Sequence, residues 1–136
     1  MSPEDNKVTV RRFYDAVITQ KNLAVLDELM GDPYVSHDLP SDPAALKRFI
    51  GGFHSAFPDG RIIIEQMIAE GDSVALRATF HGTQTGKFQD IPPTGKTVTV
   101  PAQDMYRLIE GKIVEHWGGP NQLRLLQQLG VLPPMG

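Results

Sequence analysis

Apolar residues recur at spacings of three and four along the first 57 positions, and this period predicts amphipathic helices. A first helix is predicted over residues 2–20, and a short second helix over 22–30, which Gly31 would end in a left-handed conformation. A third helix is expected to begin at position 41 or 42 and to end at 57. The segment 34–40 between the last two helices is interpreted as a connection.

From residue 61 the apolar period falls from about 3.6 to 2, which predicts β-strands. The β-branched runs lie at 62–64, 74–80, 97–100, 105–109 and 113–117. We expect one antiparallel sheet with a tight turn at 110–111, a longer loop at 86–96 and a final amphipathic stretch at 121–128. Helices followed by strands are typical of an α+β fold with the helices on one face of the sheet, so we predict a single domain over residues 1–136.

The turn at Glu110-Gly111 decides which side chains meet across the last hairpin. A two-residue type I′ turn needs a positive φ at both residues, which is unfavourable for glutamate, whereas a bulged type I turn needs it only at the glycine. We therefore predict the bulged form. Its cross-strand pairs would be Tyr106 with Val114, Asp104 with His116, and Ala102 with Gly118.

This register makes Asp104 and His116 neighbours on one face, about 5 Å apart at Cβ. A carboxylate beside an imidazole stabilises the charged ring and fixes its tautomer, which suits a group that transfers protons near neutral pH. The pair can equally be a structural hydrogen bond between two strands, since buried polar groups are normally paired. The opposite face would carry Met105, Ile113 and Trp117, an apolar set that predicts a homodimer.

Composition narrows the classes of partner and cofactor. The formal net charge of -3 and the scattered basic residues argue against nucleic acid as a partner. No apolar run reaches the roughly 20 residues of a membrane span, and the N-terminus does not resemble a signal peptide, so we expect a cytoplasmic protein with no membrane partner. There are no cysteines and no closely spaced histidine pair, and we therefore expect no bound metal.

Six short segments, in order along nearly the whole chain from about Val8 to Leu132, resemble the SnoaL-like polyketide cyclases and ester cyclases of the nuclear transport factor 2-like superfamily. The segments are Val10-Arg11-Arg12-Phe13-Tyr14, Ala56-Phe57-Pro58-Asp59, Gly82-Thr83-Gln84-Thr85-Gly86, Ile91-Pro92-Pro93-Thr94-Gly95-Lys96, Gly111-Lys112-Ile113-Val114-Glu115-His116-Trp117 and Leu125-Leu126-Gln127-Gln128-Leu129-Gly130. The resemblance implies an α+β barrel or cone, in which a curved antiparallel sheet and three N-terminal helices enclose a central pocket. It also implies a dimer without metal or organic cofactor.

The resemblance implies which positions of this chain correspond to the site residues of the family. The aspartate that serves as base in the family's aldol cyclases corresponds to Gly118, and the next acid corresponds to Asn121, so neither position supplies a base. His116 is retained, and Asp104 occupies the place of a pocket histidine. We therefore expect His116 and Asp104 to be catalytic. The predicted substrate-binding residues are His37, Gln84, Tyr106, Phe13 and Phe53.

Two functions remain open at this point. The first is a cofactor-independent enzyme that moves a proton on a hydrophobic, carbonyl-bearing metabolite, with His116 as the base and Asp104 orienting it. The second is a non-catalytic protein that binds a small molecule in the same pocket, because one fold can host many functions. The missing acid at Gly118 keeps the second possibility open.

Overall fold

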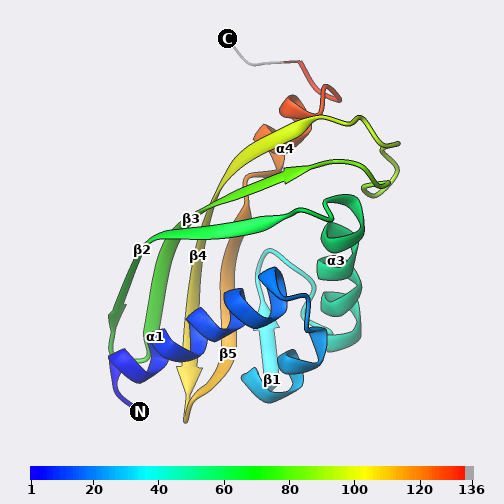
Figure 1. The fold of residues 1–136 in the computed structure, drawn as a ribbon. Coiled ribbons are helices and arrows are strands. Elements are labelled where there is room, and N and C mark those ends of the chain that lie inside the picture. Colours follow the sequence, from blue (N-terminus) through cyan, green and yellow to red (C-terminus); the bar gives the residue numbers. More distant parts are fainter. Residues whose placement is uncertain (134–136) are drawn as a thin grey trace.

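A curved five-stranded sheet runs through the molecule, and helices lie against one of its faces (Figure 1). The computed structural model describes residues 1–133, so the last three positions of the predicted domain lie outside the described residues. The sheet order is β1-β5-β4-β3-β2, and the sheet stays open between its edge strands β1 and β2 instead of closing into the expected barrel. The strands are β1 (Met30–Ser36), β2 (Arg61–Glu70), β3 (Ser73–Thr83), β4 (Thr97–Ile109) and β5 (Lys112–Pro120).

The helices follow the predicted order, and the α+β class is confirmed. They are α1 (Pro3–Arg12), its π-helical continuation η1 (Phe13–Thr19), the short pair η2 (Leu23–Val25) and α2 (Leu26–Leu29), then α3 (Pro43–Ala56) and α4 (Gln122–Gln128). Ser2 caps α1 in a capping box, and Asp42 caps α3 by accepting the Ala45 N–H at 3.0 Å. None of the helices in residues 1–133 has the length and apolar run needed to cross a bilayer.

Strand β1 corrects the prediction for residues 31–40. Gly31 does not end a helix in a left-handed conformation but lies inside β1, which pairs in parallel with β5. A Cβ at Gly31 would lie 2.7 Å from Cγ1 of Val114, so the glycine allows close approach of the two strands. The sheet is therefore mixed, not wholly antiparallel.

Strand β4 also differs from the prediction, because it joins the expected strands 97–100 and 105–109 into one. It passes through Pro101, which pairs with Thr79 of β3. The Pro101 carbonyl, at the same time, accepts the Asn121 N–H at 2.9 Å. A proline has no N–H to donate to a neighbouring strand, but here the strand continues through it.

The last hairpin has a different register from the predicted one. Glu110 and Gly111 both have positive φ, 50° and 77°, and form a two-residue turn between Ile109 and Lys112. An irregularity after Ile113 then leaves Val114 unpaired against β4. The observed pairs are Tyr106 with His116, Asp104 with Gly118, and Ala102 with Pro120.

The observed register is displaced by two residues from the predicted one, so Asp104 and His116 remain on the same face as diagonal neighbours. Because Val114 is an extra residue in β5, the side chain of Ile113 points to the opposite face from the one predicted. Ile113, predicted on the outer face, is therefore fully buried in the core.

The outer face still carries exposed apolar side chains. Met105 is 42% exposed and Ile68 is 59% exposed. Both line a hollow of about 410 Å³ together with Trp117 and polar residues of β2, β3 and β4. The predicted homodimer surface therefore consists of Met105, Ile68 and Trp117, and Ile113 is not part of it.

We expect Trp117→Glu to weaken self-association, because it would place a charge within the apolar surface defined by Met105, Ile68 and Trp117. Sedimentation velocity at micromolar concentration measures the effect. Val8→Glu, at an exposed position of α1, is the matched control and should leave association unchanged. A wild-type protein that sediments as a monomer would contradict the dimer prediction.

Two apolar clusters fill the space between the helices and the sheet. The larger one joins the N-terminal helices to the inner faces of β3, β4 and β5. The smaller one gathers around Phe57 and Phe80 and includes Leu125 and Leu129 of the α4 region. Both clusters contribute side chains to one pocket, which is described next.

Candidate active site

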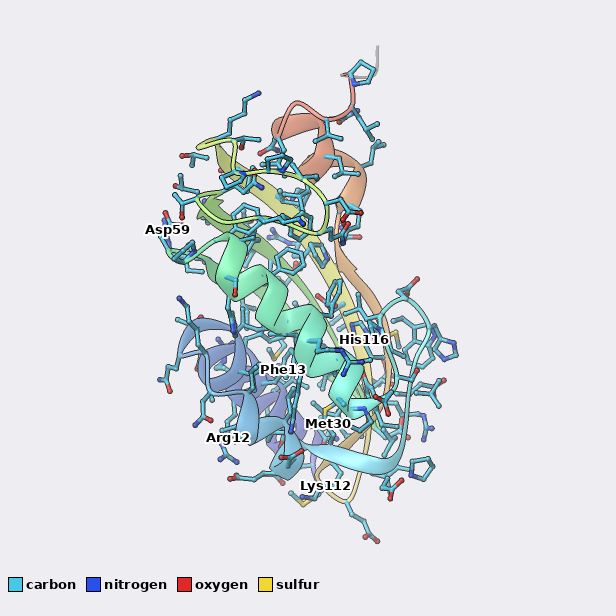
Figure 2. The ribbon with its side chains drawn as sticks, turned by 90° about the vertical axis from the view of Figure 1, so that its right-hand side faces the viewer. Arg12, Phe13, Met30, Asp59, Lys112 and His116 are labelled. Atoms are coloured by element: carbon cyan, nitrogen blue, oxygen red, sulfur yellow. The ribbon has the colours of Figure 1, made fainter. Side chains whose placement is uncertain are left out.

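The pocket lies between α3, the N-terminal helices and the inner face of the sheet. Its free volume is about 90 Å³. In Figure 2, α3 runs across the front of the region where two lining residues, Phe13 and His116, are labelled. Most lining side chains are apolar, and among the described residues no lysine or arginine lines it. A ligand in this pocket would therefore be held mainly by apolar contact and a few polar groups.

Five of the seven predicted site residues line the pocket, namely Phe13, Phe53, Asp104, Tyr106 and His116. Phe53 belongs to an aromatic end, where its ring lies 5.8 Å from Phe80 and 6.1 Å from Phe57. Asp104 and His116 belong to a polar end on β4 and β5. The pocket thus joins an aromatic wall to a small polar group.

The polar end is built around His116, which is 2% exposed. Its Nε2 lies 2.7 Å from Oδ1 of Asp104, and its Nδ1 lies 2.8 Å from Oγ of Ser36. Ser36 stands directly beside His116 because β1 pairs with β5. The ring is therefore fixed from two sides, by one residue of β4 and one of β1.

The hydrogen bonds indicate where the protons lie. Ser36 Oγ already accepts the Leu39 N–H at 3.0 Å, so its own proton is available to His116 Nδ1. The other ring nitrogen, Nε2, then carries the proton that is donated to Asp104. In this arrangement neither nitrogen of His116 has a lone pair free for a ligand.

Asp104, by contrast, keeps an oxygen available. Within residues 1–133 the Asp104 side chain makes one hydrogen bond, which joins its Oδ1 to His116 Nε2. Oδ2 of Asp104 has no side-chain hydrogen bond in that range and is not one of its fully enclosed unpaired atoms, and Asp104 lines the pocket. Asp104 can therefore accept a proton at Oδ2 while His116 holds Oδ1.

Two tyrosines complete the polar end. The hydroxyls of Tyr14 and Tyr106 lie 2.6 Å apart and are buried. Burial, and then the negative charge of Asp104, raise the pKa of each well above its usual value. Tyr34 also lines the pocket, and burial raises its pKa to about 12. All three phenols stay protonated at neutral pH.

Three of these residues, Tyr14, Tyr34 and Ser36, were not predicted for the site. Tyr14 lies four residues after Val10 and three before Val17, a spacing typical of one apolar helix face, and this signal could have indicated it. The π-helical turn η1 is wider than an α-helical turn, and the rings of Phe13 and Tyr14 are both buried, with centroids 5.1 Å apart. Ser36 and Tyr34 were missed because β1 was interpreted as a connection.

His37 does not reach the pocket. It lies on the outer side of the sheet, where its ring stacks on Trp117 at 5.0 Å and its Nε2 lies 2.7 Å from Glu115 Oε2. Hydrogen bonds from Arg107 and then His37 lower the pKa of Glu115. The predicted substrate-binding role of His37 is not supported by this position.

Gln84 is also outside the pocket lining, although it is fully buried. Its Nε2 donates to the carbonyls of Ile91 and Pro92 at 3.2 Å, and its Oε1 accepts from the hydroxyl of Thr94 at 2.7 Å. The amide is therefore used to hold the loop over residues 86–96. Gln84 therefore anchors this loop, and its predicted substrate-binding role is not supported by this position.

Gly118 and Asn121, the two positions that correspond to acids in the aldol cyclases, have structural roles here. Gly118 has φ +103°, and a Cβ there would overlap the backbone oxygen of Gln103. Its N–H donates to Asp38 Oδ2 at 2.7 Å. Asn121 caps α4 by accepting the Arg124 N–H at 3.0 Å. The residues described contain no group of three or more His, Cys, Asp or Glu placed to hold a metal ion.

Comparison with known proteins agrees with this architecture. Residues 8–129 match the SnoaL-like polyketide cyclase family. Nogalonic acid methyl ester cyclase of Streptomyces nogalater is 25% identical over 111 residues, covering 77% of this chain and 83% of its own.

Two solved structures are also similar. AclR of Streptomyces galilaeus, a candidate hydroxylase, has a TM-score of 0.87 and 30% identity, over 99% of this chain and 87% of its own. A candidate SnoaL-like polyketide cyclase from Jannaschia sp. CCS1 has a TM-score of 0.84 and 25% identity, over 98% of both chains. The match over residues 8–129 places the chain in the SnoaL-like polyketide cyclase family.

Proposed function

We propose that the protein is a cofactor-independent enzyme that removes and returns a proton at the carbon beside the carbonyl group of a hydrophobic metabolite. The observation that carries this proposal is Asp104, which lines the apolar pocket and whose Oδ1 is held by His116, while Oδ2 has no hydrogen-bond partner among the described residues. A positioned base of this kind contributes typically 10²- to 10⁴-fold to the rate of proton transfer.

The proposal changes the roles of the two predicted catalytic residues. Asp104 is the base, because both nitrogens of His116 are already hydrogen-bonded. His116 supports the carboxylate and keeps it oriented, and Ser36 fixes the tautomer of the ring. The same two residues are involved, but the proton acceptor is Oδ2 of Asp104 and not a ring nitrogen of His116.

The lining of the pocket favours a neutral substrate. No lysine or arginine among the described lining residues could pair with a substrate carboxylate, and Asp104 would repel one. An esterified or ketonic carbonyl compound fits this environment better than a free acid. The relative from Streptomyces nogalater is named for a methyl ester substrate, which is in keeping with this preference.

The free volume of about 90 Å³ is small beside the roughly 300 Å³ or more of typical ligand pockets. A ligand of several rings therefore requires α3 to move outward. Gly51 and Gly52 lie in the middle of α3, where a Cβ on either would meet no atom closer than 3.8 Å. No neighbouring atom requires a glycine at either position, and each glycine weakens the helix by about 1 kcal/mol relative to alanine. A less stable α3 moves more easily.

The test uses acetophenone, a one-ring aryl ketone suited to the narrow pocket, in D₂O. We expect wild-type protein to accelerate the replacement of its methyl hydrogens by deuterium, followed by mass spectrometry. A heat-denatured sample is the control. Saturable binding of acetophenone without any acceleration of exchange would contradict the proposal and would favour the binding-only function, which the absence of a side chain at Gly118 supports.

A further inference from the structure

A second cavity adjoins the pocket at the beginning of α3. It lies between α2, strand β1 and the first turn of α3, and its volume is about 520 Å³. Three side chains, Met30, Tyr34 and Leu46, line both this cavity and the pocket. They form the wall between the inner pocket, with about 90 Å³ of free volume, and the larger cavity, which we call the outer hollow.

The outer hollow continues the long axis of the pocket. Leu46, Phe49, Ile50 and Phe53 all line the pocket, and their spacing of three and four residues places them on one face of α3. At 1.5 Å per residue, the pocket follows α3 for roughly 10 Å from Leu46 to Phe53. Phe53 belongs to the aromatic end of the pocket, whereas Leu46 belongs to the wall. The outer hollow therefore lies at the end of the pocket opposite the aromatic side chains.

The proposed base lies near the same wall. Ser36, whose Oγ is 2.8 Å from His116 Nδ1, and Tyr34 are two residues apart in β1. Side chains two residues apart on a strand point to the same face, so Tyr34 stands beside the polar end of the pocket. When the ring of an aryl ketone occupies the aromatic end and its carbonyl group lies near Asp104, a chain on the other side of the carbonyl points toward the outer hollow.

The wall between the two cavities consists of side chains that can move. Met30 and Tyr34 are only half-buried, whereas Leu46 is buried. Methionine is unbranched and has three rotatable bonds, so it adapts its shape readily. A narrow alkyl chain can thus pass from the pocket into the outer hollow by rotation of side chains in β1, without a displacement of α3.

The outer hollow has an acidic lining. Asp27, Asp32 and Asp42 line it, and none of its described lining residues is lysine, arginine or histidine. Asp27 is paired with Lys47 at 2.9 Å, and Asp42 caps α3. Asp32 is exposed, and its side chain has no hydrogen bond or ion pair within residues 1–133. Carboxylates accept hydrogen bonds but do not donate them, so this lining suits a donor group and repels an anion.

We propose that the outer hollow is a second compartment of the substrate site, which holds a hydrogen-bond-donating end group of the substrate. This inference rests on the proposed function and names the substrate class. The substrate is an aryl ketone or ester whose carbonyl group carries an extended chain that ends in a hydroxyl or an ammonium group. The inner pocket holds the ring and the carbonyl group, and the chain passes between Met30, Tyr34 and Leu46.

The experiment uses four phenyl ketones whose second substituent is a hexyl chain. The chain ends in hydrogen, hydroxyl, ammonium or carboxylate, and the four ketones are otherwise identical. Isothermal titration calorimetry at pH 7 gives the dissociation constant of each ketone, and mass spectrometry follows deuterium exchange at the carbon beside the carbonyl. Wild type is compared with Asp32→Asn. Asp90→Asn, which removes an exposed carboxylate from the loop over residues 86–96, is the matched control.

We expect the hydroxyl and ammonium ketones to bind wild type roughly 2- to 10-fold more tightly than the unsubstituted ketone, as for one added hydrogen bond. The carboxylate ketone should bind about 5-fold more weakly or worse, because it brings like charges together. Asp32→Asn should reduce both the gain of the ammonium ketone and the loss of the carboxylate ketone by about 2- to 5-fold. The hydroxyl ketone should change little, since the asparagine Oδ1 still accepts. Asp90→Asn should resemble wild type.

The outcomes separate this inference from the proposed function. If the four ketones bind wild type equally, or if Asp32→Asn and Asp90→Asn change their affinities to the same extent, the second compartment is overturned. Deuterium exchange in wild type would then still support the proposed function. If the affinities follow the expected order but wild type exchanges none of the ketones, the outer hollow is a ligand compartment and the proposed function is overturned.

Discussion

Replacing Asp104 by asparagine is expected to slow deuterium exchange of acetophenone by at least about 10²-fold, the lower end for the loss of a general base. Asparagine matches the shape of the carboxylate, and its Oδ1 can still accept the hydrogen bond from His116 Nε2. The atom that changes is the free one, because an amide nitrogen would replace the proton-accepting Oδ2. The measurement is the exchange rate per folded molecule, with folding followed by circular dichroism.

Two further variants identify the cause of the loss. Asp38→Asn is the matched control, since it changes an exposed carboxylate that binds only the Gly118 N–H among the described residues. It should leave exchange unchanged. If the Asp104 and His116 pair is only a structural hydrogen bond, Asp104→Asn and His116→Gln would lower the free energy of unfolding by about 1 to 3 kcal/mol and leave exchange unchanged, which would contradict the assignment.

The polar pair could be predicted from the sequence even though the register was wrong. The turn was expected to be bulged because positive φ is unfavourable for glutamate, yet Glu110 adopts φ 50°. The bulge occurs instead at Val114, inside β5. Because side chains alternate along a strand, a displacement by two residues leaves Asp104 and His116 on their predicted face. The same bulge reverses Ile113, so the outer face could not be predicted equally well.

The parts of the site that were missed depend on contacts between distant segments. Ser36 supports His116 only because β1 pairs in parallel with β5, and nothing in the local pattern of residues 30–36 indicates that partner. Tyr14 stands four residues after Val10 and three before Val17, so helical periodicity could have indicated its burial, but its contact with Tyr106 of β4 depends on the tertiary fold. The substrate-binding role predicted for Gln84 came from the resemblance, which does not show that a loop already uses its amide.

Gly118→Asp is expected to destabilise the protein by about 3 kcal/mol or more without creating a new base. The substitution would place an acid at the position that corresponds to the aspartate of the aldol cyclases, so resemblance alone predicts a gain of activity. Two features of the backbone oppose it. Gly118 has φ +103°, which L-residues rarely adopt, and its Cβ would overlap the backbone oxygen of Gln103.

The overlap involves a backbone atom of the neighbouring strand, so no rotation of a side chain can relieve it. Gly119→Ala tests the effect of a positive φ without a backbone overlap. The φ of Gly119 is +141°, but the nearest atom to its Cβ is a Leu39 side-chain carbon at 3.5 Å. Urea unfolding should give a loss of about 1 to 2 kcal/mol for Gly119→Ala and a clearly larger loss for Gly118→Asp. A Gly118→Asp protein of wild-type stability would show that β5 can take another path at this point. The acid could then reach the pocket, and the assignment of the base to Asp104 would lose its structural argument.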